Sequence, residues 1–106
     1  MKLISSAEFD SEVLRSKEPV LVDFFTEHCG PCRMLAPTLE ELEREGKFKL
    51  VKVDAAAEAT LAASYGVNAV PALFAFKNGN VMGQTVGLKS KAGLAKWFED
   101  SLQTSA

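Results

Sequence analysis

The chain has 106 residues with 12 basic and 14 acidic side chains, so its formal net charge is −2 at pH 7. This length predicts a single domain covering residues 1–106. Hydrophobic residues make up 47% and charged residues 25%, which excludes an intrinsically disordered chain. The slightly acidic balance argues against nucleic acid or an anionic membrane surface as a partner, because binding to either needs a basic face.

The sequence shows neither a membrane-spanning segment nor a signal peptide. Its longest apolar stretch, residues 67–76, is interrupted by Asn68 and Pro71 and is shorter than the ~20 residues that a spanning helix needs. Met1 to Glu8 contain no long apolar segment of the kind that secretory signals have. We therefore expect no membrane attachment, although a mature chain whose signal had been removed would look the same.

The first predicted elements are a short strand near residues 2–4 and a helix over residues 5–16. Ser5 and Glu8 have the spacing of a capping box at the start of this helix. Its apolar stripe consists of Phe9, Val13 and Leu14. The almost continuous apolar run at residues 20–25 then predicts a strand that is covered on both faces.

A second helix is predicted over residues 32–45, ending before Gly46. Pro37 lies inside it and is expected to kink it. The residues expected to face inward are Met34, Leu35, Leu39 and Leu42. Residues 50–53 have the pattern of another buried strand.

The C-terminal half predicts one more helix, a hairpin and a closing helix. In order, these are an alanine-rich helix at 58–65, strands at 72–77 and 81–86, and a helix at 90–102. Asn78-Gly79 between the two strands is a strong signal for a tight hairpin turn. The closing helix is expected to bury Leu94, Trp97, Phe98 and Leu102 on one face, and residues 103–106 are expected to fray.

This order of elements predicts an α/β fold. Strands separated by helices pair in parallel through right-handed crossovers, whereas a hairpin adds antiparallel pairing. We expect a central mixed β-sheet of roughly four to five strands flanked by four helices that cover both faces.

The two cysteines, Cys29 and Cys32, are too few for a disulfide scaffold. With only one histidine in the chain, the two cysteines cannot form a tetrahedral zinc site, so we expect no metal. A redox pair is favoured over an inert pair or adventitious metal binding.

Cys29 lies just before a predicted helix, whose unpaired N–H groups should lower its pKa and favour the nucleophilic thiolate. Gly30 permits a tight turn and Pro31 suits a first helical turn. Cys32, one turn on, can attack a mixed disulfide on Cys29.

Asp23 is a carboxylate in the middle of an apolar strand, where a charge is unfavourable unless it has a partner or a chemical role. It is either a strand-end aspartate satisfied by a neighbouring helix or a buried acid–base group that takes the proton of Cys32. Burial would raise its pKa toward neutrality.

The segment from Val20 to Pro37, with Cys29-Gly30-Pro31-Cys32, resembles the thioredoxin family. The similarity extends over nearly the whole chain, through Lys52, Tyr65-Gly66-Val67, Val70-Pro71, Phe76-Lys77-Asn78-Gly79 and Val86-Gly87. A Cys-x-x-Cys motif by itself is weakly specific, but these companions at the family's spacing make it strong. The resemblance implies the thioredoxin fold and assigns Asp23 the proton-acceptor role, relayed by water.

The resemblance also implies roles for residues outside the motif. Lys52 is either a charge partner that tempers Asp23 or a side chain whose stem lies on the sheet and whose ammonium reaches water. The Val70–Pro71 peptide bond is expected to be cis, with Val70 pairing its backbone with an extended client segment. Gly87, with Gly30 and Ala72, would leave an apolar surface for that client, unless Gly87 serves only as a turn.

The sequence departs from the family at His28, which precedes the first cysteine where tryptophan is usual. His28 is either a neutral surface change or a residue whose positive ring, formed near neutral pH, favours the Cys29 thiolate. Phe25 and Ala72 also replace the more common tryptophan and threonine. These changes bear on partner preference and redox potential more than on reaction type.

We therefore expect a cytoplasmic thiol–disulfide oxidoreductase that reduces protein disulfides. The sequence has no glycine-rich phosphate loop, so we expect no bound cofactor. By resemblance, the electron donor is thioredoxin reductase, an NADPH-dependent flavoprotein; the clients are disulfide-containing proteins, and the chain is a monomer. The alternatives are a disulfide oxidase or isomerase of an exported compartment, and a non-catalytic interaction subunit with this fold.

Overall fold

The computed structural model describes residues 1–46 and 48–103. Its strands are β1 (Lys2–Leu3), β2 (Val20–Phe25), β3 (Lys49–Asp54), β4 (Ala72–Lys77) and β5 (Asn80–Val86). Its α-helices are α1 (Ser6–Phe9), α2 (Gly30–Arg44), α3 (Ala59–Ser64) and α4 (Lys91–Leu102), and a π-helical turn, η1 (Asp10–Leu14), follows α1. Of the predicted C-terminal tail, residues 104–106 lie outside the described residues.

The five strands form one sheet in the order β1-β3-β2-β4-β5. β3 pairs in parallel with β1 and β2, whereas β4 pairs antiparallel with β2 and β5. The sheet is therefore mixed, as predicted. Asn78 (φ 52°) and Gly79 (φ 79°) both adopt the left-handed backbone that a tight hairpin between β4 and β5 requires.

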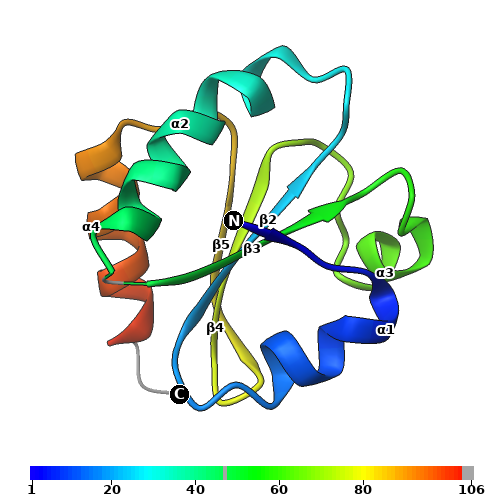
Figure 1. Cartoon of the computed structure of the whole chain (residues 1–106), viewed down its shortest axis with the longest axis horizontal. Coiled ribbons are helices and arrows are strands. Elements are labelled where there is room, and N and C mark those ends of the chain that lie inside the picture. The colour runs from blue at the N-terminus through cyan, green and yellow to red at the C-terminus, as the bar shows by residue number, and fades with distance from the viewer. Residues whose placement is uncertain (47, 104–106) are drawn as a thin grey trace.

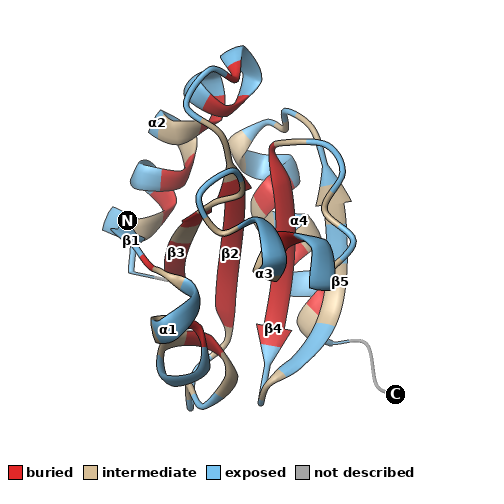
Figure 2. Ribbon diagram, turned by 90° about the vertical axis from the view of Figure 1, so that its right-hand side faces the viewer, coloured by how far each residue is buried: buried red, intermediate tan, exposed pale blue. Residues whose placement is uncertain are grey.

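Two hydrophobic clusters cover the two faces of the sheet. α1 and α3 lie on one side and α2 and α4 on the other, while β2 and β4 are buried between them (Figures 1 and 2). The α1/α3 face is filled by a cluster that includes Phe9, Val22, Phe24, Phe74 and Phe76. The α2/α4 face is filled by Leu21, Leu35, Leu39, Leu73, Leu94 and Phe98, among others. The predicted α/β fold with helices on both faces is confirmed.

The first helix departs from the prediction in its second half. The capping box is present, since the Ser5 N–H donates to the Glu8 carboxylate at 3.0 Å. After Phe9, however, the chain widens into the π-helical turn, in which the Arg15 N–H donates to the Asp10 carbonyl at 2.9 Å. The prediction of a regular α-helix over residues 5–16 is therefore only partly correct.

The second helix begins at Gly30, two residues before the predicted start. Cys29 serves as its N-cap, and Pro31 fits the first turn because the amide hydrogen that it lacks would have no partner there. The prediction that Met34 faces inward is wrong, since Met34 is 66% exposed. Leu35, Leu39 and Leu42 are buried as predicted. In the described part of the chain, no helix has the length and apolar character needed to cross a membrane.

Candidate active site around Cys29 and Cys32

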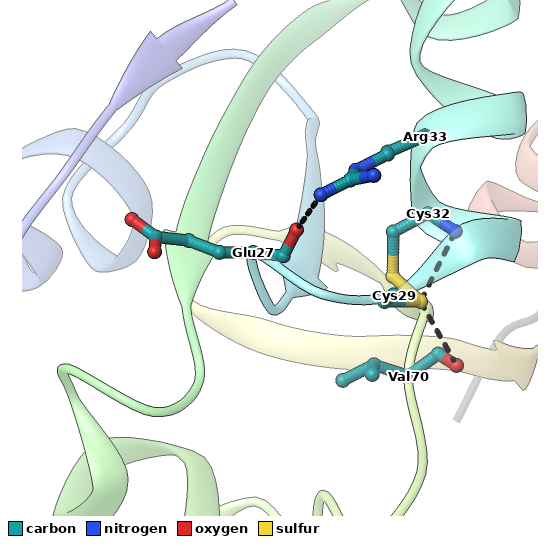
Figure 3. Close-up of a disulfide and its surroundings, with 5 residues drawn as sticks. All are labelled: Glu27, Cys29, Cys32, Arg33 and Val70. Carbon is teal, nitrogen blue, oxygen red and sulfur yellow. Dashed lines mark hydrogen bonds between the residues drawn. A yellow bond between two sulfur atoms is a disulfide. The ribbon is translucent and has the colours of Figure 1, made fainter.

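Cys29 and Cys32 lie where β2 has ended and α2 begins. They form a disulfide, with their Cα atoms 5.2 Å apart. The Cys32 backbone N–H points at the Cys29 sulfur, with 3.1 Å between nitrogen and Sγ (Figure 3). Both residues are largely buried, Cys29 at 9% and Cys32 at 7% exposure. The predicted position of Cys29 at the start of a helix is confirmed.

This location is chemically favourable for a thiolate. The first N–H groups of a helix have no backbone acceptor, and the N-terminal end of the helix carries partial positive charge. In the reduced protein, the Cys32 N–H that now contacts the Cys29 sulfur is placed to donate to a Cys29 thiolate. Such a charge-assisted hydrogen bond stabilises the anion and so lowers the pKa of a thiol.

The loop before β4 also approaches the Cys29 sulfur, which the Cys32 N–H contacts from α2. The Val70–Pro71 peptide bond is cis, as expected from the resemblance. The Val70 carbonyl oxygen lies 3.7 Å from the Cys29 sulfur (Figure 3). The Gly87 N–H donates to the Pro71 carbonyl at 2.9 Å, so the residue that follows β5 lies against the loop before β4. Val70 thus lies beside Cys29, and Gly87 is held against Pro71, the next residue of that loop.

Gly30 and Gly87 both have open space where a side chain would begin. A Cβ atom added at Gly30 or at Gly87 would meet nothing within 4 Å. Gly87 also has φ +98°, a conformation that side chains with a Cβ rarely adopt. Ala72, which was expected to contribute to the apolar surface, does not, because it is only 2% exposed. His28 lies on the exposed loop directly before Cys29.

Asp23 is buried in the centre of the sheet. It is 4% exposed, and among the residues that the structure describes no group hydrogen-bonds to its buried Oδ1. Burial raises the pKa of Asp23 to about 7, and the positive charge of Lys52 acts in the opposite direction. The expectation of a desolvated carboxyl in β2 is therefore correct, and the alternative of an aspartate satisfied by a neighbouring helix is not supported.

Lys52 is the partner of Asp23 across the sheet. The two residues are opposite each other in the parallel pairing of β2 with β3. The Lys52 side chain is half-buried, and its Nζ lies 5.6 Å from the centre of the Phe25 ring. This placement supports the alternative of a charge partner, since the charge of Lys52 lowers the pKa of Asp23.

A cavity of about 160 Å³ connects the buried acid with the second cysteine. Its walls contain Met1, Asp23, Phe25, Thr26, Glu27, Cys32, Arg33, Ala36 and Lys52. We call it the Asp23 cavity. Because Asp23 and Cys32 both line it, the structure brings together the two groups that the sequence linked in one proton transfer. The cavity wall also includes Arg33, which directly follows the motif, and Thr26, three residues before Cys29; the sequence reasoning missed both.

A second hollow, of about 340 Å³, adjoins Val70 on the α3 side of the disulfide. It is lined by Thr26, Ala55, Ala56, Ala59, Ala62, Ala63, Val67, Asn68, Ala69 and Val70. None of these side chains is charged, and we call this site the alanine-lined hollow. The alanine-rich sequence after β3 was interpreted only as a helix, although the same small residues leave the space for this hollow.

Comparison with known proteins agrees with this geometry. The thioredoxin family model matches residues 1–100. The chain is 40% identical to a thioredoxin of Pseudomonas aeruginosa over 101 residues, covering 93% of this chain and 94% of that protein. It is 42% identical to a thioredoxin of Synechocystis sp. with the same coverage. It is 38% identical to a thioredoxin of Rickettsia felis, covering 93% and 96% of the two chains.

Fold, paired cysteines and relatives thus agree on one chemistry. The mixed sheet, the disulfide at the start of α2 and the near-complete coverage of each relative leave the sequence resemblance confirmed. Cys29 and Cys32 are the redox-active pair of a thiol–disulfide oxidoreductase. The chain belongs to the thioredoxin family, whose members are protein-disulfide oxidoreductases.

Proposed function

We propose that this protein is a cytoplasmic protein-disulfide reductase in which residues 1–106 act as one thioredoxin domain. The observation that carries this proposal is the placement of Cys29 as the N-cap of α2, with the Cys32 N–H directed at its sulfur. That arrangement favours a reactive Cys29 thiolate at the N-terminus of α2. Reduction suits a compartment in which thiols are kept reduced.

The reaction begins at Cys29. Its thiolate attacks one sulfur of a client disulfide, a Cys29–client S–S bond forms, and the other client sulfur leaves as a thiolate that takes up a proton. Val70 and the open positions at Gly30 and Gly87 would receive the client segment, with Val70 pairing its backbone as in β-strand addition. His28 would border this segment on the exposed loop, and the alanine-lined hollow beside Val70 offers uncharged space for client side chains.

Cys32 then resolves the mixed disulfide. Its thiol gives its proton to the Asp23 carboxylate, and its sulfur attacks the Cys29 sulfur. The Cys29–Cys32 disulfide forms, the second client sulfur leaves and is protonated, and the client has gained two electrons and two protons. A pKa of about 7 suits Asp23 for this task, because the carboxyl can both accept and release a proton near neutral pH.

The Asp23 cavity supports this proton transfer. At about 160 Å³ it has room for the water that would relay a proton between Cys32 and Asp23. Lys52 is proposed as a supporting residue, since its charge keeps the pKa of Asp23 from rising further. Gly30 and Pro31 support the turn that holds the two cysteines one helical turn apart.

Turnover requires a two-electron donor that reduces the Cys29–Cys32 disulfide again. By family resemblance we propose an NADPH-dependent flavoprotein, thioredoxin reductase, so that the protein takes part in electron transport from NADPH to client disulfides. The clients would be proteins that form disulfides during their own turnover. We propose that the protein acts as a monomer, carries no bound cofactor and maintains cell redox homeostasis.

The proposal is tested with insulin as a small disulfide-bonded substrate and dithiothreitol as the electron donor. The wild-type protein should accelerate insulin reduction, whereas Cys29→Ser should abolish the acceleration. Cys32→Ser protein that is reduced beforehand and mixed with insulin without dithiothreitol should accumulate a mixed disulfide, which added dithiothreitol releases. If the Cys29→Ser protein reduced insulin as fast as the wild type, the proposed chemistry would be wrong.

The direction of electron flow needs a second measurement. Equilibration of the Cys29–Cys32 pair with glutathione buffers reports its reduction potential. A reductase requires a disulfide that glutathione reduces poorly. A pair that glutathione reduces readily would contradict the reductase proposal and favour an oxidase or isomerase.

A further inference from the structure

Arg33 makes a hydrogen bond that joins the two segments around Cys29. Its Nη2 donates to the main-chain carbonyl oxygen of Glu27, with 2.8 Å between the two atoms. Arg33 lies in the first turn of α2, and Glu27 lies in the loop that follows β2. Figure 3 shows the guanidinium directed at this carbonyl while the Glu27 carboxylate points away from it. The contact therefore ties the loop to the helix through the backbone and not through an ion pair.

The contact lies on the wall of the Asp23 cavity. Both Arg33 and Glu27 line this cavity and both are exposed, whereas Asp23 and Cys32 line it and are buried. The Arg33–Glu27 hydrogen bond therefore joins two exposed residues of the cavity wall, whereas Asp23 and Cys32 form the buried part of that wall. An arginine suits such a position, because its planar guanidinium can be fixed by a hydrogen bond while remaining in contact with water.

We propose that Arg33 is a positioning residue for the proton transfer between Cys32 and Asp23: its guanidinium, held on the Glu27 carbonyl, covers the Asp23 cavity and limits the entry of water. This inference rests on the proposed role of Asp23 as the proton acceptor. It gives the exposed residue directly after the Cys-Gly-Pro-Cys motif a role that does not require contact with the client.

The sign of the effect separates a cover from a simple charge. As a nearby cation, Arg33 would favour the ionised form of Asp23, so its removal would raise the pKa of Asp23. As a cover, Arg33 keeps the carboxyl desolvated, so its removal would lower that pKa. Burial is the main cause that raises the pKa of Asp23, and Lys52 supplies the opposing charge. The raised pKa of Asp23 thus depends mainly on burial, which is the property that a cover would maintain.

Other charged and titratable groups that line the cavity must be considered in the same test. They are Lys52 on β3, Cys32 on α2, Glu27 in the loop, and the amino group of Met1, which pairs with Glu43 at 2.8 Å. Arg33→Ala and Arg33→Lys leave all of these groups in place, and the control Glu27→Ala removes the Glu27 carboxylate.

The experiment is a pH titration of the Asp23 carboxyl by ¹³C NMR in reduced and oxidised protein. Arg33→Ala should lower the pKa of Asp23 by about one unit, because water gains access to the carboxyl. The pH profile for the attack of Cys32 on a mixed disulfide should move in the same direction. Arg33→Lys keeps the charge but has no planar guanidinium, and it should give part of the decrease. A charge mechanism predicts no change for Arg33→Lys.

Two controls isolate the contact. Arg44→Ala removes an exposed cation from the far end of the same helix and should leave the pKa of Asp23 within a few tenths of a unit. Glu27→Ala removes the carboxylate but keeps the carbonyl that accepts the hydrogen bond, and it should also leave the pKa nearly unchanged. Thermal unfolding of each variant verifies that it remains folded, which is expected because the substituted side chains are exposed.

The outcomes distinguish this inference from the proposed function. An unchanged or raised pKa of Asp23 in Arg33→Ala overturns the role of Arg33 as a cover, whatever Asp23 does. If Asp23→Asn resolved mixed disulfides at the wild-type rate at every pH, the acceptor role of Asp23 would fail, and with it the consequence for the reaction. A lowered pKa in Arg33→Ala would in that case still establish the cover.

Discussion

The two faces of β2 differ in what their buried side chains do. Val20, Val22 and Phe24 point into the cluster beneath α1 and α3, where every buried member is apolar. Leu21 belongs to the cluster beneath α2 and α4, and the next residue on that face is Asp23. One strand thus combines an apolar face with a face that carries a buried acid, because successive side chains point to opposite sides of a sheet.

The α1/α3 face is organised by aromatic contacts. Phe76 lies 5.7 Å from Phe9 and 5.6 Å from Tyr65 between ring centres, and Phe24 lies 5.4 Å from Phe74. Such edge-on pairs add to the stabilisation that apolar burial provides. This face serves stability.

The α2/α4 face carries the chemistry because the N-terminus of α2 is on that side. There the Asp23 cavity interrupts the packing, and a carboxyl is held without a hydrogen bond to its Oδ1 from any described residue. The fold thus confines the buried acid to one face of its central strand, while the buried side chains that β2 contributes to the other face are all apolar.

The largest expected effect comes from breaking the apolar face. Phe76→Ala should lower the free energy of unfolding by about 3–5 kcal/mol, since Phe76 is 1% exposed and its removal leaves a cavity among rings. Urea unfolding at pH 5 and pH 8 should give the same loss, because no titrating group is involved. A loss below about 1 kcal/mol would show that this face is not tightly packed.

Asp23→Asn should have the opposite effect on the other face. The pKa of Asp23 is about 7 in the folded protein and 3.8 without burial, so the folded state binds the proton more tightly. The contribution of Asp23 to stability is therefore fully present below about pH 4 and is lost as the pH rises to about 7. Removing the carboxylate should raise the free energy of unfolding at pH 8 by about 2–4 kcal/mol and change it little at pH 4.

Urea unfolding of both proteins across this pH range measures that difference directly. An equal change at pH 4 and pH 8 would mean that ionisation of Asp23 is not the cause of the difference in stability.

The same variant, Asp23→Asn, should slow the resolution of a mixed disulfide by about tenfold or more at neutral pH, because the proton acceptor is missing.

Lys52→Met sharpens the comparison by removing a positive charge that favours ionised Asp23. The pKa of Asp23 should rise, by about half a unit, and the pH at which stability falls should move up with it. Lys49→Met is the matched control, because Lys49 lies at the other end of β3. Its Nζ is 3.7 Å from the Oε1 atom of Glu12. Titration of Asp23 by NMR would contradict this view if both variants shifted it equally.

His28→Trp tests whether the exposed loop adds a smaller, pH-dependent influence. A protonated histidine beside Cys29 favours the thiolate, so the variant should change the pH dependence of Cys29 alkylation between pH 5 and 8 by about two- to threefold. The rate is followed by mass spectrometry of the reduced protein. Identical profiles would make His28 a neutral surface substitution.

Much of this arrangement was predictable from local sequence. The apolar run at residues 20–25 and the Asn78-Gly79 turn have direct physical signals, and Asp23 was conspicuous because it interrupts such a run. The cis bond before Pro71 was expected from resemblance, since spacing carries no signal for it.

The remaining features depend on contacts that a one-dimensional pattern does not contain. Met34 was misplaced because the three leucines at 35, 39 and 42 already complete the buried stripe of α2, and Met34 falls about 100° away from Leu35 around the helix. The Arg33 contact was missed because its acceptor is a backbone carbonyl, which any residue at position 27 supplies.

The central claim is that Cys29 is a thiolate near neutral pH and attacks first. The most direct test is the rate at which iodoacetamide modifies each cysteine of the reduced protein from pH 5 to pH 9, with Cys29 and Cys32 distinguished by peptide mass spectrometry. We expect Cys29 to react at pH 7 about ten times faster than free cysteine and well ahead of Cys32. A Cys29 that reacts no faster than free cysteine, or later than Cys32, would contradict the account.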